Sequence, residues 1–173
     1  MIYCLPKSGA SWLVRVVPQL DCRVLGPSDI STGVFVVRHP YRVINSLYGT
    51  PLYATTSQLH PNLPSYGYDW VWVENDQFAK LAAYWEFLVS KALKTCEAWF
   101  RIEDISSYPE KFEEFCRVVG VRIEDTNFQK YFAIKTNRSH KHYLPSCLCG
   151  LPKPQRKLLE MICRSATEVG YTF

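Results

Sequence analysis

The chain has 173 residues, of which 47% are hydrophobic and 21% charged, and its 20 Lys and Arg against 16 Asp and Glu give a formal net charge of +4. This composition is that of a globular protein and excludes an intrinsically disordered or fibrous chain. The length predicts one domain over residues 1–173. No apolar run approaches the roughly 20 residues of a membrane span, so no membrane partner is expected.

The charges are distributed unevenly along the chain. Residues 1–50 carry five bases and two acids, residues 51–131 eight bases and twelve acids, and residues 132–173 seven bases and two acids. If the two positive ends meet in space, they form a focused positive site for a small polyanion. A nucleic-acid-binding protein would more often have a larger basic excess, so a phosphorylated ligand is predicted and no nucleic acid.

The seven cysteines are an odd number scattered through apolar segments, unlike the paired framework of a small secreted domain. This usage predicts reduced, buried thiols. Cys147 and Cys149 lack the spacing and the second ligand pair of a zinc site, so no metal is expected. The N-terminal residues also lack the charged region of a signal peptide, and a cytoplasmic location is predicted.

The first predicted strand, residues 2–5, leads into a loop of small residues that opens a short helix. A loop of this kind at a helix N-terminus directs free N–H groups and the positive end of the helix dipole at one place, which suits a phosphate or sulfate. It differs from the nucleotide-triphosphate loop GxxxxGK[ST], because only one glycine is present and the lysine precedes the turn. The loop reads Pro6-Lys7-Ser8-Gly9-Ala10-Ser11-Trp12.

The second predicted strand, residues 34–37, is a largely β-branched run typical of a strand buried on both faces of a parallel sheet. Arg38 follows at its carboxyl end, where ligands bind in open parallel sheets. Arginine is suited to bidentate contacts with phosphate. Pro40 is suited to start a helix, and Ser46 would lie two turns inside it.

Residues 49–73 are rich in proline and aromatic side chains but have no clear period, which predicts a long loop or lid. Its exposed Tyr and Trp side chains would form part of an acceptor site. The remaining predicted elements are a helix capped by Asn75, a strand over residues 98–102, a helix opened by a capping box at residues 107–110, and a last helix from near Pro154 to Gly170. Strands that alternate with helices predict an α/β fold with a parallel sheet.

Together these motifs resemble the PAPS-dependent sulfotransferases, whose sulfuryl donor is 3'-phosphoadenosine 5'-phosphosulfate (PAPS). Residues 6–12 match the family's PKSGTTW-like loop, which holds the 5'-phosphosulfate. Arg38, Pro40 and Ser46 match its second motif, which holds the 3'-phosphate. Weaker similarity covers residues 101–104 and the last helix. The resemblance is to the short, soluble bacterial or viral members of the family.

The resemblance implies a three-layer α/β/α, P-loop-like sulfotransferase fold. It also implies transfer of a sulfuryl group from PAPS to a hydroxyl or amine of a small-molecule or glycan acceptor, with Lys7 as the main catalytic cation. Donor binding would fall to Lys7, to the loop residues Ser8, Gly9, Ala10, Ser11 and Trp12, and to Arg38 and Ser46. Arg138 and Lys141, in the late basic loop, would close over the donor.

The general base is left between two residues. Asp29 lies near the position at which some relatives carry a carboxylate, and His60 lies in the predicted lid with an ordinary pKa of about 6.5. Asp29 is preferred, because a base is better fixed on the scaffold side of the reacting group. Two other functions stay open: a P-loop-like kinase, and a non-catalytic module that binds PAPS or another nucleotide.

Overall fold

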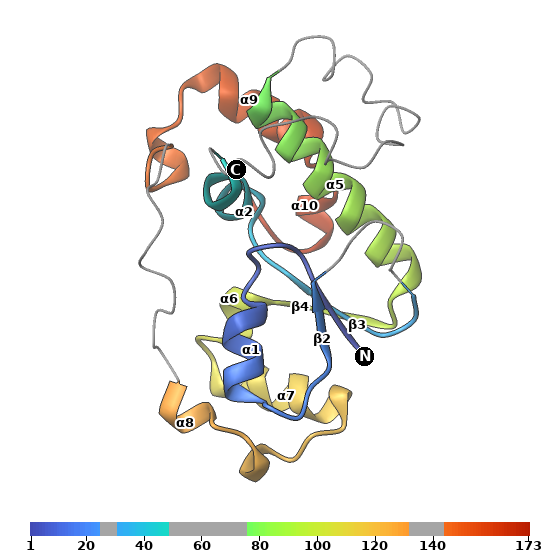
Figure 1. Ribbon diagram of the computed structural model, residues 1–173. Coiled ribbons are helices and arrows are strands. Elements are labelled where there is room, and N and C mark those ends of the chain that lie inside the picture. The colour runs from blue at the N-terminus through green and yellow to red at the C-terminus, as the bar shows by residue number, and fades with distance from the viewer. Residues whose placement is uncertain (25–30, 49–75, 132–143) are drawn as a thin grey trace. The chain divides into compact units, whose positions relative to one another are not determined.

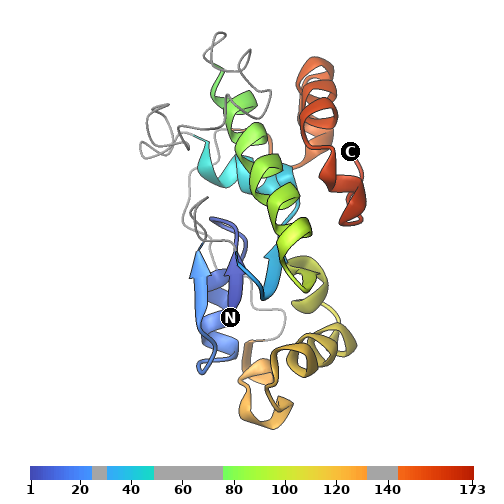
Figure 2. The same cartoon turned by 90° about the vertical axis from the view of Figure 1, so that its right-hand side faces the viewer.

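The computed structural model describes residues 1–24, 31–48, 76–131 and 144–173 (Figures 1 and 2). Their strands are β1 (Ile2–Cys4), β2 (Cys22–Val24), β3 (Val34–Val37) and β4 (Ala98–Arg101). The longer helices are α1 (Ala10–Val16), α2 (Pro40–Leu47), α5 (Gln77–Thr95), α7 (Pro109–Val119) and α9 (Lys153–Ile162). Short helical turns are α6 (Ile102–Ile105), η3 (Ile123–Asp125), α8 (Phe128–Tyr131), η4 (Leu148–Gly150) and α10 (Ser165–Glu168).

The four strands form one parallel sheet in the order β2-β1-β3-β4. Ile2 of β1 pairs with Cys22 and with Val34, and Val34 pairs with Ala98. The predicted α/β class with a parallel sheet is confirmed, and the three strands predicted at residues 2–5, 34–37 and 98–102 are β1, β3 and β4. β1 and β3 are fully buried, as their continuous apolar sequences indicate.

The chain divides into two compact units, each made from two segments. The first unit comprises Met1–Arg38 and Lys91–Ser139 and contains the sheet. The second comprises His39–Ser90 and His140–Phe173. The single domain over residues 1–173 stays a prediction, and the proposed lid at residues 49–73 lies outside the described residues.

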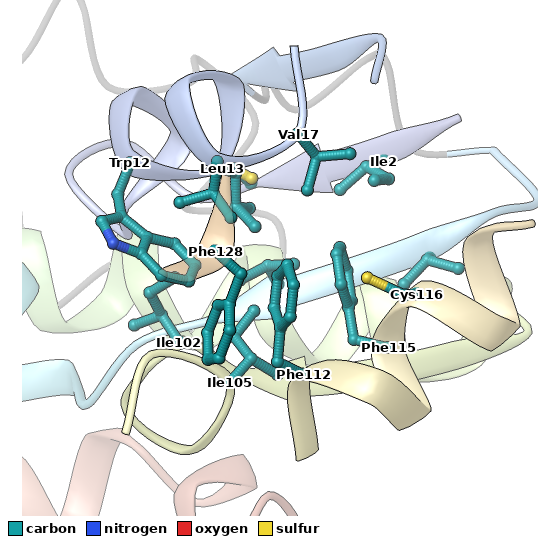
Figure 3. Close-up of a cluster of buried hydrophobic side chains, with 14 residues drawn as sticks. Ile2, Trp12, Leu13, Val17, Ile102, Ile105, Phe112, Phe115, Cys116 and Phe128 are labelled. Carbon is teal, nitrogen blue, oxygen red and sulfur yellow. The ribbon is translucent and has the colours of Figure 1, made fainter. Parts of the chain in front are cut away.

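An aromatic core lies between one face of the sheet and the helices α1, α6, α7 and α8 of the first unit (Figure 3). Phe112 of α7 stacks on Phe128 with ring centroids 4.1 Å apart and meets the edge of Trp12 at 6.1 Å. The N–H of Asn127 donates to the carbonyl of Val16 at 2.7 Å and so joins α8 to the end of α1. These contacts hold α1, and the loop before it, against the sheet.

Two helix starts differ from their predictions. Proline fits the first turn of a helix, so α7 begins at Pro109 behind Tyr108, and Ser107 lies too early to cap it. The predicted capping box is therefore wrong. Asn75 lies outside the described residues, and the carboxylate of Asp76 accepts a hydrogen bond from the N–H of Phe78 at 2.8 Å at the start of α5.

The cysteines are not all reduced and buried, contrary to the prediction. Cys147 and Cys149 form a disulfide, and both are exposed. Cys4, Cys116 and Cys163 are buried free thiols, and Cys22 and Cys96 are half-buried. The spacing of Cys147 and Cys149 by itself predicts neither a zinc site nor this bridge.

Candidate functional site

The loop between β1 and α1 has an unusual backbone at two residues. Lys7 has φ of 62° and Gly9 has φ of 94°, so both lie in the left-handed region. For a lysine this conformation is uncommon and costs of the order of 1 kcal/mol, so surrounding contacts must hold it in place. Such strain often accompanies a binding loop.

Three hydrogen bonds hold the loop. The guanidinium of Arg38, at the carboxyl end of β3, donates to the carbonyl oxygen of Lys7 at 2.6 Å. The N–H of Ser8 donates to the carbonyl of Leu5 at 3.1 Å, and the Ser8 hydroxyl donates to the same oxygen. Ser8 is fully buried, so its hydroxyl serves the turn. The contact between Arg38 and the loop was not foreseen, although the parallel pairing of β1 and β3 brings their carboxyl ends to one edge.

Gly9 is required by sterics as well as by its φ. A Cβ on this residue would lie 2.5 Å from Cγ1 of Ile102, where α6 begins. Ile102 is buried in the aromatic core, so the loop rests directly on that core. The sequence predicts Gly9 as a donor-binding residue and gives no sign of Ile102, because nothing in the sequence connects the two residues.

The loop presents N–H groups at the start of α1. Trp12 and Leu13 donate to the carbonyl of Gly9 at 2.9 and 3.0 Å. Among the described residues, the N–H groups of Gly9, Ala10 and Ser11 have no main-chain acceptor. They lie at the positive end of the α1 dipole, and Gly9 and Ala10 are half-buried while Ser11 is exposed. This is an arrangement that favours an anion.

The electrostatics of this edge are positive. Lys7 and Arg38 are both half-buried and follow neighbouring strands of the sheet. The nearby cation Arg101, at the end of β4, is paired with Asp104 at 2.6 Å. Trp12 was also predicted to bind the donor, but its side chain is buried against Phe112 and belongs to the core.

Ser46 lies in the second unit, on α2, and is half-buried. His39 caps this helix, because its Nδ1 accepts a hydrogen bond from the N–H of Tyr41 at 3.2 Å. The Tyr41 hydroxyl and the Asn45 amide both donate to the carbonyl of Pro145, Asn45 at 3.0 Å. Burial raises the pKa of Tyr41. Pro145 therefore fixes the helix that carries Ser46.

The other predicted site residues lie outside the described part of the chain: Asp29, His60, Arg138 and Lys141. Within the described ranges, no group of three His, Cys, Asp or Glu side chains is placed to hold a metal ion. No helix within those ranges is long and apolar enough to cross a bilayer. What the structure brings together is Lys7, the loop amides and Arg38.

No protein-family model matches this chain, and no curated protein or solved structure matches it either.

Proposed function

We propose that this protein is a PAPS-dependent sulfotransferase that moves a sulfuryl group to a hydroxyl or amine of a small-molecule or glycan acceptor. The observation that carries the proposal is the loop at residues 6–12. There a left-handed Lys7, the Arg38 guanidinium and three N–H groups that have no main-chain acceptor within the described part of the chain lie at one edge of a parallel sheet. We propose the three-layer, P-loop-like sulfotransferase fold on the same basis, with the cytoplasm as its compartment.

The hydrogen-bonding groups of this loop suit the anionic groups of PAPS. N–H groups, an ammonium and a guanidinium are all hydrogen-bond donors, and the loop has no carboxylate to repel an anion. PAPS supplies the sulfuryl group. The amides of Gly9, Ala10 and Ser11 would bind the negatively charged oxygens of the sulfuryl group. Lys7 would neutralise the charge that develops on the bridging oxygen as it leaves.

Arg38 has two roles in the proposal. It holds the Lys7 carbonyl, and its guanidinium would also bind the donor's 3'-phosphate, because an arginine suits phosphate contacts. Ser46 adds a hydroxyl to the same phosphate. Arg138 and Lys141 would cover the donor, and the aromatic residues of 49–73 would orient the acceptor.

The acceptor proton would go to a general base, for which Asp29 is preferred over His60. The two substitutions Asp29→Asn and His60→Gln separate these candidates in single-turnover transfer. The base variant should lose the chemical step and still bind PAPS.

A P-loop-like kinase is the second candidate within the same fold, and a non-catalytic nucleotide-binding module is the third. The kinase is disfavoured, because no glycine precedes Lys7 as in the GK[ST] sequence, and the hydroxyl of Ser8, which follows Lys7, is buried and donates to the Leu5 carbonyl. Mass spectrometry of acceptor mixtures incubated with the protein and either PAPS or ATP distinguishes the three. A sulfated product indicates the sulfotransferase, and a phosphorylated product indicates the kinase. The absence of any product indicates the non-catalytic module.

Lys7→Ala is the variant that tests the loop. Transfer should fall by about two orders of magnitude or more, comparable to the loss of one transition-state donor. The matched control is Lys94→Ala, which removes an exposed lysine in the last turn of α5. Titration calorimetry with 3',5'-bisphosphoadenosine gives a readout that does not depend on turnover. Equal turnover in the two lysine variants would contradict the assignment.

Arg38 and Ser46 are tested by nucleotide choice. Arg38→Ala and Ser46→Ala should weaken binding of 3',5'-bisphosphoadenosine far more than binding of 5'-AMP. Equal losses for both nucleotides would show that the residue acts on the loop or the fold and does not contact the 3'-phosphate.

A further inference from the structure

The turn over residues 144–150, in the second unit, carries a feature that sulfuryl transfer does not use. It contains the Cys147–Cys149 disulfide, and both cysteines are exposed. By contrast, Cys4, Cys116 and Cys163 are buried. Burial raises the pKa of Cys116 to about 11 and also raises the pKa of Cys163. Cys147 and Cys149 are thus more open to solvent and to another thiol than the free cysteines, which are buried or half-buried.

Stability does not account for this bridge. A disulfide stabilises a fold chiefly by restricting the unfolded chain, and that effect falls as the closed loop shortens. This one closes a loop with a single residue between the two cysteines, so it restricts the unfolded chain very little. Exposed disulfides of little structural value are typically labile ones.

The surrounding charge favours thiolates. Lys153, Arg156 and Lys157 follow directly in the chain, and no Asp or Glu stands between Leu144 and Glu160. The cysteines also precede the N-terminus of the ten-residue helix α9. Positive charge and a helix N-terminus both stabilise the thiolate form of a cysteine, which is the form that reacts.

The backbone holds the two cysteines together without the bridge. The carbonyl of Pro145 accepts hydrogen bonds from Tyr41 and Asn45, so the start of the turn is fixed to α2. At its other end the N–H of Gly150 donates to the carbonyl of Cys147 at 3.1 Å. The Cα atoms of the two cysteines lie 5.3 Å apart, within the range for a disulfide. A turn held in this way keeps two reduced thiols close enough to re-form the bond.

We propose that Cys147 and Cys149 form a redox-active pair whose disulfide exchanges with a thioredoxin-like dithiol. This exchange is independent of the proposed sulfuryl transfer. A thiolate of the dithiol attacks one sulfur, the S–S bond breaks, and the other cysteine leaves as a thiolate. The second thiol of the reductant then attacks the mixed disulfide and releases the first cysteine. Two electrons pass to the protein, the dithiol becomes a disulfide, and its two protons end on the cysteine thiols.

The test is a redox titration of the folded protein. The full chain is equilibrated in buffers of oxidised and reduced dithiothreitol, thiols are blocked with N-ethylmaleimide without denaturant, and the peptide that contains both cysteines is quantified by mass spectrometry. The ratio of doubly labelled to unlabelled peptide should change tenfold for each change of about 30 mV in the redox potential of the buffer, as a two-electron couple requires. Circular dichroism should be unchanged across the series.

Two variants sharpen the test. In glutathione buffers, Cys147→Ser should leave Cys149 in a mixed disulfide with glutathione that cannot resolve. Cys96→Ser removes a half-buried thiol outside the turn. This variant should show the same change in labelling with buffer potential as the native protein. The proposal is overturned if both cysteines carry the label in fully oxidising buffer. It is equally overturned if the bridge resists every buffer until the protein is unfolded.

Discussion

The two compact units of this chain hold their ionisable groups in opposite ways. In the first unit the core cluster is entirely apolar, and Arg101–Asp104, Lys111–Glu114 and Arg122–Asp125 are local pairs three residues apart outside it. In the second unit Lys80 and Glu86 are themselves buried. The difference teaches that the first unit keeps charged side chains out of its apolar core cluster, whereas the second buries two of them and must compensate the cost of burying a charge.

Glu86 is the clearest case of such a contact. Its carboxylate accepts the N–H of Ser165 at 2.9 Å and the Ser165 hydroxyl at 2.8 Å, so it caps the start of α10. Burial raises the pKa of Glu86 more than the hydrogen bonds from Ser165 lower it. Burial also lowers the pKa of Lys80, against the opposing effect of Asp76.

The largest effect is expected from Phe112→Ala in the apolar core of the first unit. The substitution removes a ring that stacks on Phe128 and contacts Trp12, and it leaves a cavity. The free energy of unfolding should fall by about 3–5 kcal/mol, measured by chemical denaturation. Phe112→Leu should recover part of the loss. A loss below about 1 kcal/mol would contradict the idea that this core specifies the unit.

Gly9→Ala tests whether the 6–12 loop depends on that core. The added Cβ would meet Ile102 at 2.5 Å in a left-handed backbone, and the unfolding free energy should fall by about 2–4 kcal/mol. Gly120→Ala is the matched control, because its φ is also positive, at 73°, but nothing lies within 4 Å of the added atom. The control should lose only about 1 kcal/mol. Similar losses in both variants would show that backbone conformation alone accounts for Gly9.

Glu86→Gln tests the buried polar contact through pH. The folded-state pKa of Glu86 is raised, so its contribution to stability is fully present below the unfolded pKa of about 4.3 and is lost as pH rises through the folded value. Relative to the native protein, Glu86→Gln should therefore become more stable as pH rises from about 4 to about 7. Denaturation curves across that range measure the change. Glu160→Gln, which removes an exposed carboxylate of α9 that is not among the charges acting on Glu86, should show no such trend.

The smallest effect is expected from Lys111→Ala. Its ammonium contacts Glu114 at 2.8 Å, but both side chains are about half exposed. Solvent and salt screen an exposed pair of this kind, so the unfolding free energy should hardly change. Thermal unfolding at low and high salt provides the measurement. A large loss that disappears in high salt would mean that surface charge matters to this unit as well.

The sequence indicated β1, α1, β3, β4 and α7 of the first unit because their signals are local, but it did not indicate the short, partly exposed strand β2. An apolar run predicts β3, and Pro109 with Gly120 marks the two ends of α7. The last helix was predicted as one element and is two. The N–H of Ser165 donates to the Glu86 carboxylate, whereas in a continuous helix it would donate to the carbonyl four residues earlier. No local pattern reveals a partner so far away in the chain.

The candidate site was predictable to a similar extent. The order strand, small-residue loop, helix placed Lys7 and the N–H groups of residues 9–11, and the strand end placed Arg38. The bond from Arg38 to the Lys7 carbonyl and the packing of Gly9 on Ile102 depend on three-dimensional contacts between segments. The left-handed backbone of Lys7 was equally hidden, because lysine has no preference for it.

The pairing of β3 with β4 has a consequence for how the chain folds during synthesis. β3 is complete when residue 37 is made, but its partner β4 begins only at residue 98. During that interval β1, β2 and β3 can associate, and the β3 edge, with its four apolar residues, has no neighbour. An unpaired apolar edge is a template for association with other chains. We therefore expect slow maturation and a requirement for chaperones at this stage, since pairing across a long sequence separation slows folding.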